Sequence, residues 1–113
     1  KRIVVDPVTT LVFQYDGQMA QRNALVELME ALADTGATCL ITTELRIPGF
    51  ERNVDYEEYL AHGVILLQQL QVGKSLLRVI QIEKMRKTPV DNQPRPYRIT
   101  ETGIEVFPRE SVL

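Results

Sequence analysis

The sequence has few of the residues that build metal sites, disulfides or membrane anchors. Cys39 is the single cysteine and His62 the single histidine of 113 residues, which argues against a zinc site. Cys39 lies in the apolar run TCLIT, a setting that favours a buried structural thiol and a reducing, cytoplasmic location. No long apolar run and no signal-peptide pattern is found, so we expect no membrane span.

The sequence also has no large excess of positive or of negative residues. The formal net charge is −2, with 25% charged and 44% hydrophobic residues, so the chain as a whole is not drawn to nucleic acid or to anionic membranes. The length predicts a single domain over residues 1–113. Because the chain begins with Lys1 and enters a strand at once, we expect it to come from the interior of a longer protein.

A phosphate-binding loop is missing as well, although VGKS at residues 72–75 has its last letters. The motif GxxxxGK[ST] needs a glycine where Gln68 stands, and a helix after it. LLRVIQIE instead follows, and its β-branched residues predict a strand. VILLQQLQ and LLRVIQIE therefore predict a hairpin, with Gly73 supplying the positive φ of its turn.

The first third of the chain predicts a parallel βαβ unit. RIVVD is expected to be a buried strand ended by Pro7, and Thr9–Gly17 a connection. A helix then begins at Asp16 or Gln18 and ends at Gly36, because Leu25, Leu28, Met29 and Leu32 recur at helical spacing. ATCLITTE follows as a strand with both faces covered, as in parallel sheets. The fold class is therefore α/β.

The rest of the chain predicts mainly hairpins. LRIPGFERN is expected to be a loop and VDYEEYLAHG a short helix ending at Gly63. The hairpin around Gly73 comes next, followed by the polar stretch EKMRKTPVDNQPRPYR. RITETGIEVF predicts a second hairpin that turns at Thr102-Gly103.

Three groups of residues are candidates for chemistry, because ligands of α/β sheets bind beyond the carboxyl ends of the strands. Asp6 follows the first strand, Thr42-Thr43-Glu44 follows the second, and Lys84 with Arg86 ends the hairpin strand. From Lys84 to Arg98 five positive residues and one negative residue give a local charge of +4, which suggests an anionic partner. Each group also has a purely structural interpretation. Asp6 could be a turn residue or a helix cap, Thr42-Thr43-Glu44 could be an ordinary strand end, and the stretch from Lys84 to Arg98 could be a solvated charged face.

The order of these segments resembles the C-terminal half of a RecA-type ATPase core, most closely the KaiC family. RIVVDPVTTL stands at the Walker B strand, TCLITTE at the strand ending in Thr/Ser-Glu, and YLAHGVILL at a segment usually containing Ala-Asp-Gly-Val-Ile. IEKMRKT is similar to the Lys-Met-Arg element, and YRITETGIEVF to the terminal hairpin. The fold implied is part of a RecA-like sheet, a parallel βαβ core followed by C-terminal hairpins, without the N-terminal phosphate-loop half.

The resemblance implies ATP and Mg²⁺ as ligands. Asp6 would hold Mg²⁺ through a water molecule, and Thr43 and Glu44 would sense the γ-phosphate or polarise the site. Lys84 and Arg86 would contact the ATP held by the next protomer of a homo-oligomer, usually a hexameric ring.

Several positions depart from the family pattern. Pro7 replaces a common hydroxyl residue, His62 a common acid, and Lys87 a common glycine. The phosphate loop and the catalytic glutamates that follow it in relatives are missing, so we expect these residues alone not to hydrolyse ATP, although the parent protein would be an ATPase.

Two other functions remain open. DNA binding by a recombinase-like relative would use the loop Leu45–Asn53 with Arg46, Arg52 and Phe50, but that loop is short and has acids beside it. A non-catalytic assembly or signalling module is the third interpretation. If the upstream strands are absent, the strand beginning at Arg2 or its neighbour becomes an unprotected edge with exposed apolar faces, which predicts dimerisation or swapping of the isolated chain.

Overall fold

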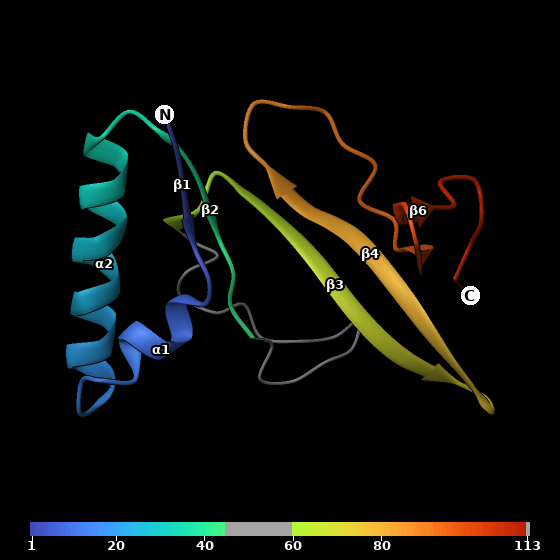
Figure 1. The fold of residues 1–113 in the computed structure, drawn as a ribbon, viewed down its shortest axis with the longest axis horizontal. Coiled ribbons are helices and arrows are strands. Elements are labelled where there is room, and N and C mark those ends of the chain that lie inside the picture. Colours follow the sequence, from blue (N-terminus) through green and yellow to red (C-terminus); the bar gives the residue numbers. More distant parts are fainter. Residues whose placement is uncertain (45–59, 113) are drawn as a thin grey trace. The chain divides into compact units, whose positions relative to one another are not determined.

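The computed structural model of the chain describes residues 1–44 and 60–112. These residues fall into two units, 1–44 with Leu60 and 61–112, each described here by itself. The first unit contains β1 (Arg2–Val5), α1 (Val8–Val12), α2 (Gln18–Asp34) and β2 (Thr38–Ile41) (Figure 1). The second contains β3 (Gly63–Val72), β4 (Ser75–Met85), β5 (Arg95–Thr100) and β6 (Gly103–Val106).

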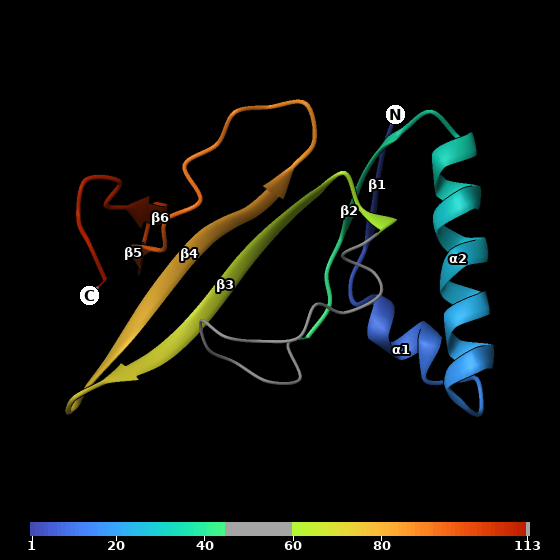
Figure 2. The same ribbon diagram turned by 180° about the vertical axis from the view of Figure 1, so that it is seen from behind.

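The first unit is the parallel βαβ arrangement that the sequence predicts. β1 pairs in parallel with β2, so that Ile3 lies beside Cys39 and Val4 beside Leu40. The helix α2 crosses between them and runs beside the two strands in both ribbon views (Figures 1 and 2). It ends as expected, with Gly36 at a φ of 70° after its last turn.

Two expectations for the first unit are wrong. The strands are not buried on both faces, because exposed and half-buried residues alternate along them and the paired Val4 and Leu40 are 64% and 62% exposed. Thr9–Gly17 is not only a connection, because α1 occupies its first part. Val8 and Leu25 are the buried hydrophobic residues of this unit among those described, and the packing of Val8 outweighs the weak helix propensity of VTTLV.

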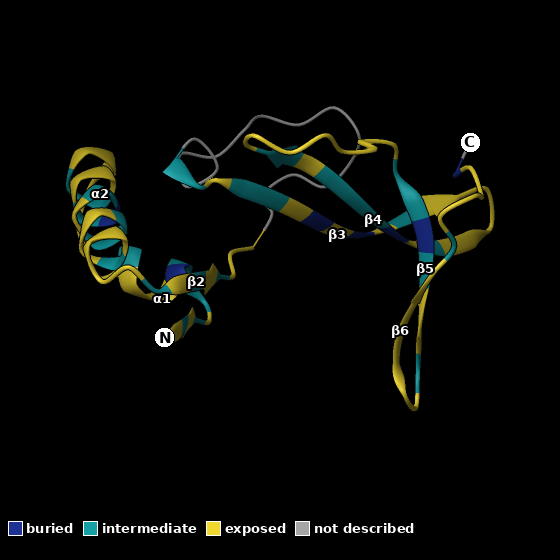
Figure 3. Cartoon of the chain, turned by 90° about the horizontal axis from the view of Figure 1, so that it is seen from above, coloured by how far each residue is buried: buried dark blue, intermediate teal, exposed yellow. Residues whose placement is uncertain are grey.

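The second unit is built on the predicted hairpin. β3 and β4 pair antiparallel from Gly63↔Met85 to Val72↔Ser75, and Gly73 takes a φ of 63° in the two-residue turn. A strand therefore follows VGKS, as the sequence predicts, and not the helix of a phosphate loop. Leu66 on β3 and Val79 on β4 are buried core residues of this unit. Figure 3 shows how burial varies along these strands.

The polar stretch after β4 and the terminal hairpin also differ in detail from the expectation. β4 continues to Met85 and pairs with β5 through Val79↔Pro96 and Ile80↔Arg95. The β5–β6 hairpin forms, but the pair Thr100↔Gly103 makes Glu101 and Thr102 its turn residues, one position earlier than expected. The Thr100 hydroxyl fixes this register by donating to the Gly103 carbonyl oxygen at 3.0 Å.

Other sequence expectations lie outside the described residues. They are the loop LRIPGFERN, including the DNA-contacting segment Leu45–Asn53, and all but the end of the helix expected over VDYEEYLAHG. Within 1–44 and 60–112, no helix is long and apolar enough to cross a lipid bilayer.

Candidate functional site

The carboxyl ends of β1 and β2 bring together two residues that are far apart in sequence. Asp6 follows β1 and Thr42 follows β2, and the Thr42 hydroxyl donates to Asp6 Oδ1 at 2.5 Å. The parallel ladder explains the contact, because it continues beyond both strands: the Thr42 N–H donates to the Val5 carbonyl and the Val8 N–H to the Thr42 carbonyl, both at 2.9 Å. The sequence prediction that these strand ends share one edge is confirmed.

A second pair of hydroxyl groups lies at the same edge. The Thr43 and Thr9 hydroxyl oxygens are 3.2 Å apart, within hydrogen-bonding distance. Thr9 belongs to α1 and was missed at the level of sequence, because Thr9–Gly17 was expected to be a connection. Its position could have been predicted because Thr9 comes three residues after Asp6, and the turn that follows a strand can bring such a residue back to the sheet edge.

The edge is polar, open and rich in oxygen. Asp6, Thr42, Thr43 and Glu44 are exposed, and Thr9 is half-buried. One carboxylate with neighbouring hydroxyls suits Mg²⁺, which usually takes one or two protein carboxylates and completes its shell with water and phosphate oxygens. No group of three or more His, Cys, Asp or Glu residues able to hold a metal is found in the described part of the chain. A single carboxylate beside hydroxyl groups therefore fits a magnesium ion that takes its other ligands from water and phosphate.

The end of β4 in the second unit carries Lys84 and Arg86. The register of the hairpin shifts between Val64 and Ile65, which pair with Lys84 and Ile82 and leave Glu83 as the extra residue of a β-bulge. Bulges of this kind change the direction of the side chains that follow them. Lys84 is half-buried opposite Val64, and Arg86 is exposed just beyond the last pair.

Two contacts hold this strand end in place. The Arg86 N–H donates to the His62 carbonyl oxygen at 2.9 Å, extending the ladder by one bond beyond Gly63↔Met85. Met85 packs against Gly63 so closely that a Cβ there would lie 2.7 Å from the Met85 sulfur. Glycine at position 63 leaves room for the Met85 side chain, so the central residue of the Lys-Met-Arg element packs against the start of β3.

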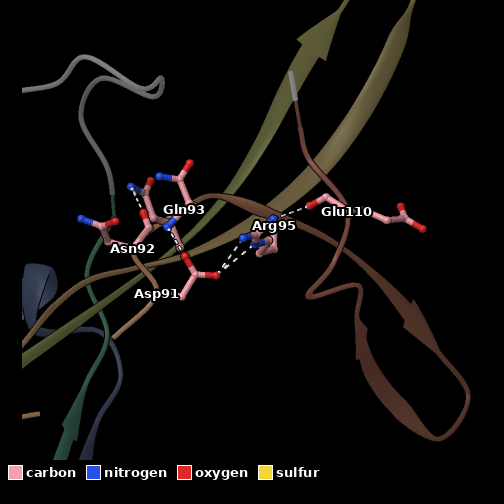
Figure 4. A network of polar contacts seen from close by, with 6 residues as sticks. Asp91, Asn92, Gln93, Arg95 and Glu110 are labelled. Atoms are coloured by element: carbon pink, nitrogen blue, oxygen red, sulfur yellow. Dashed lines mark hydrogen bonds and ion pairs between the residues drawn. The ribbon is translucent and has the colours of Figure 1, made fainter. Parts of the chain in front are cut away.

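A network of hydrogen bonds and an ion pair stabilises the segment that follows Arg86. Asp91 Oδ2 accepts from Arg95 Nε at 3.2 Å and Nη2 at 2.9 Å, and Asp91 Oδ1 accepts from the Gln93 N–H at 3.1 Å (Figure 4). Arg95 Nη1 also donates to the Glu110 carbonyl at 2.9 Å. The Gln93 N–H, and then Arg95, lower the pKa of Asp91 below its usual value because both stabilise its charged form.

The same segment is tied to β4 by a side chain. Gln81 Nε2 donates to the Asn92 carbonyl oxygen at 3.0 Å. Because Gln81 lies three residues before Lys84, this bond connects the far part of the segment to the strand that carries the candidate cations. The sequence did not predict the network, since Gln81, Asp91 and Arg95 are separated by residues without a periodic pattern.

The candidate residues thus lie in two groups. Asp6, Thr43 and Glu44 belong to the first unit, and Lys84 and Arg86 to the second. Among the described strands β1–β2 and β3–β6 form separate sheets, so no ladder joins the groups, and their convergence on one ligand stays a prediction.

Parallel strands that end in a carboxylate and hydroxyls, continued in sequence by antiparallel hairpins, are typical of RecA-like α/β domains. A crystal structure of a KaiC-like protein from Pyrococcus horikoshii has this fold and is similar to the chain, with a TM-score of 0.80 and 32% sequence identity. The match covers 96% of this chain and 47% of that one.

Sequence comparisons give the particular family. The profile of the family described as "ATPase: KaiC" matches residues 1–111. The circadian clock oscillator protein KaiC of Synechococcus elongatus is 34% identical over 110 residues, which are 96% of this chain and 21% of that protein. A UPF0273 protein of Pyrococcus furiosus is 32% identical over 115 residues, covering 96% of this chain and 43% of the relative. The chain belongs to the KaiC ATPase family and spans less than half the length of these relatives.

Proposed function

We propose that residues 1–113 form the part of one KaiC-like ATPase domain that completes an ATP site, with both units belonging to that domain. The observation that carries the proposal is the Asp6–Thr42 contact at the ends of parallel strands. It presents a carboxylate at the edge of the sheet where α/β folds bind their ligands. Membership of an ATPase family supports a nucleotide as the ligand of this edge.

In this proposal Asp6 holds the magnesium ion of MgATP through a water molecule. Thr42 supports it by occupying one carboxylate oxygen, which leaves Oδ2 for the ion's hydration shell. Thr43 and Glu44 lie next in sequence, at the end of β2, and would respond to the γ-phosphate. When bound, the magnesium ion would supply positive charge that offsets the negative charge of the phosphates.

Lys84 and Arg86 play the second role, that of cations reaching the ATP of a neighbouring protomer in a ring. Their support is the fixed strand end: a bulge at Glu83, the Arg86–His62 hydrogen bond and the Met85–Gly63 packing hold the backbone of the element. A cation held in advance near the transferred phosphoryl group stabilises the transition state without reorganisation. The protein would then be a homo-oligomer, for which the resemblance to the KaiC family implies a hexameric ring.

Single substitutions in the protein as its own cells make it test these roles. Arg86→Ala should lower kcat for ATP hydrolysis by about 10³-fold, the effect of losing an arginine finger. Arg98→Ala is the matched control, because Arg98 is an exposed arginine of the same unit that has no proposed contact with ATP; it pairs with Glu105 at 2.7 Å. Equal kcat values for Arg86→Ala and wild type would contradict the proposal. So would binding of single-stranded DNA, without ATP turnover, in fluorescence anisotropy.

A further inference from the structure

Lys87 has a backbone conformation that a lysine rarely takes. Its φ of 61° lies in the left-handed region, and it is the one non-glycine residue with a positive φ in the described ranges 1–44 and 60–112. Side chains with a Cβ are disfavoured there, whereas glycine takes the conformation without strain. The four other positive φ values in those ranges all belong to glycines.

Hydrogen bonds of the two neighbouring residues hold the backbone on either side of Lys87. On one side the Arg86 N–H is bonded to the His62 carbonyl at 2.9 Å, at the end of the β4 ladder. On the other side the Thr88 N–H donates to the Met85 carbonyl at 3.3 Å, and the Thr88 hydroxyl donates to the Arg86 carbonyl at 3.4 Å. The Met85–Thr88 hydrogen bond closes a four-residue turn in which Lys87 is the third residue, and its positive φ there is one that glycine takes without strain.

The positive charge of the region is concentrated next to this position. Of the five cations between Lys84 and Arg98, Arg95 pairs with Asp91 and Arg98 with Glu105. Three of the five, Lys84, Arg86 and Lys87, lie within four residues of chain. Lys87 is exposed and takes part in neither the Arg95–Asp91 nor the Arg98–Glu105 ion pair.

We infer that Lys87 is a third phosphate-binding cation beside Lys84 and Arg86, an inference that rests on the proposed function. If Lys87 were only a solvated side chain without a ligand, nothing would offset the strain at position 87, where glycine would fit without strain. Strain of this kind persists where the side chain has a use, as at ligand clamps. The left-handed turn places an additional ammonium group directly after Arg86, and the clamped turn limits the freedom of its backbone. The ligand class is the triphosphate of ATP.

Kinetics of ATP hydrolysis with Lys87→Gly in the protein as its own cells make it test the inference. The variant should raise KM for ATP about fivefold with kcat within about twofold of wild type, the pattern of a lost exposed charge-assisted contact. Its melting temperature should rise, because glycine relieves the strain. Lys87→Arg should keep KM within about twofold, because it retains a cation.

The control is Lys74→Gly, which removes the same charge at the other end of the hairpin. Roughly 35 Å of strand separates the two lysines at about 3.3 Å per residue, so KM should not change. A wild-type KM in Lys87→Gly, beside a large loss of kcat in Arg86→Ala, would overturn the role of Lys87 alone. Wild-type kinetics in both variants would overturn the proposed function together with this inference.

Discussion

At the residue scale, we expect Lys87 to lower the stability of the fold and to strengthen the binding of ATP. A left-handed residue with a Cβ is destabilised by about 1 kcal/mol relative to glycine. Lys87→Gly should therefore raise the free energy of unfolding by about 1 kcal/mol, measured by urea denaturation of the 113-residue chain. Lys74→Gly is again the matched control, since no positive φ is found there. A less stable Lys87→Gly variant would show that the lysine side chain itself supports the turn.

Asp91 gives a pH-dependent prediction at the same scale. Its folded-state pKa lies below the unfolded value, so its contribution to stability is complete above the unfolded pKa of about 4 and is lost as pH falls through the folded pKa. NMR titration of the Asp91 carboxyl carbon should show this lowered pKa, and Arg95→Gln should raise it toward the usual value. An unchanged pKa in Arg95→Gln would leave the Gln93 N–H as its sole cause.

At the scale of elements, the start of β3 and the end of β4 depend on one close contact. Gly63→Ala would place a Cβ 2.7 Å from the Met85 sulfur and 3.0 Å from its methyl carbon, so the methionine must move. We expect a loss of about 1 kcal/mol in stability, at the low end for overpacking because the Met85 side chain is flexible.

A double-mutant cycle checks this mechanism. Met85→Ala removes the obstructing side chain, so adding Gly63→Ala to it should destabilise the protein much less than Gly63→Ala does alone. Additive free energies in the cycle would mean that the glycine is needed for its backbone and not for space.

The elements that the sequence predicted are those with local signals. A short apolar run predicted β1, β-branched residues predicted β4, helical spacing of Leu and Met residues predicted α2, and Gly73 predicted the hairpin turn. The Asp6–Thr42 contact was also within reach, because parallel strands end at one edge. These predictions needed no knowledge of how distant segments pack.

The features that the sequence did not predict depend on packing or on exact register. α1 forms although VTTLV is a poor helix sequence, because Val8 is buried. The bulge at Glu83 and the turn at Glu101-Thr102 depend on which residues pair across the strands, and a shift of one position changes both. The exposure of Val4 and Leu40 contradicts the expectation of strands covered on both faces, but it agrees with the expectation of exposed apolar faces near Arg2.

At the scale of the whole molecule, the exposed apolar face of β1 and β2 predicts self-association of the isolated 113 residues. Val4 and Leu40 are neighbours in the parallel register and are both more than half exposed. Such faces favour pairing with another copy. Light scattering at high concentration should show dimers, and Val4→Thr with Leu40→Thr should shift them toward monomers. A wild-type chain that stays monomeric would contradict this prediction.

The central claim is that Asp6 of one protomer and Arg86 of the next serve the same ATP. Two inactive variants, Asp6→Asn and Arg86→Ala, should therefore complement each other when their subunits are mixed. In a head-to-tail ring assembled at random, roughly a quarter of the interfaces combine an intact Asp6 with an intact Arg86. ATP hydrolysis by the mixed protein should recover to about that fraction of wild type. No recovery in rings shown to contain both variants would contradict the shared site.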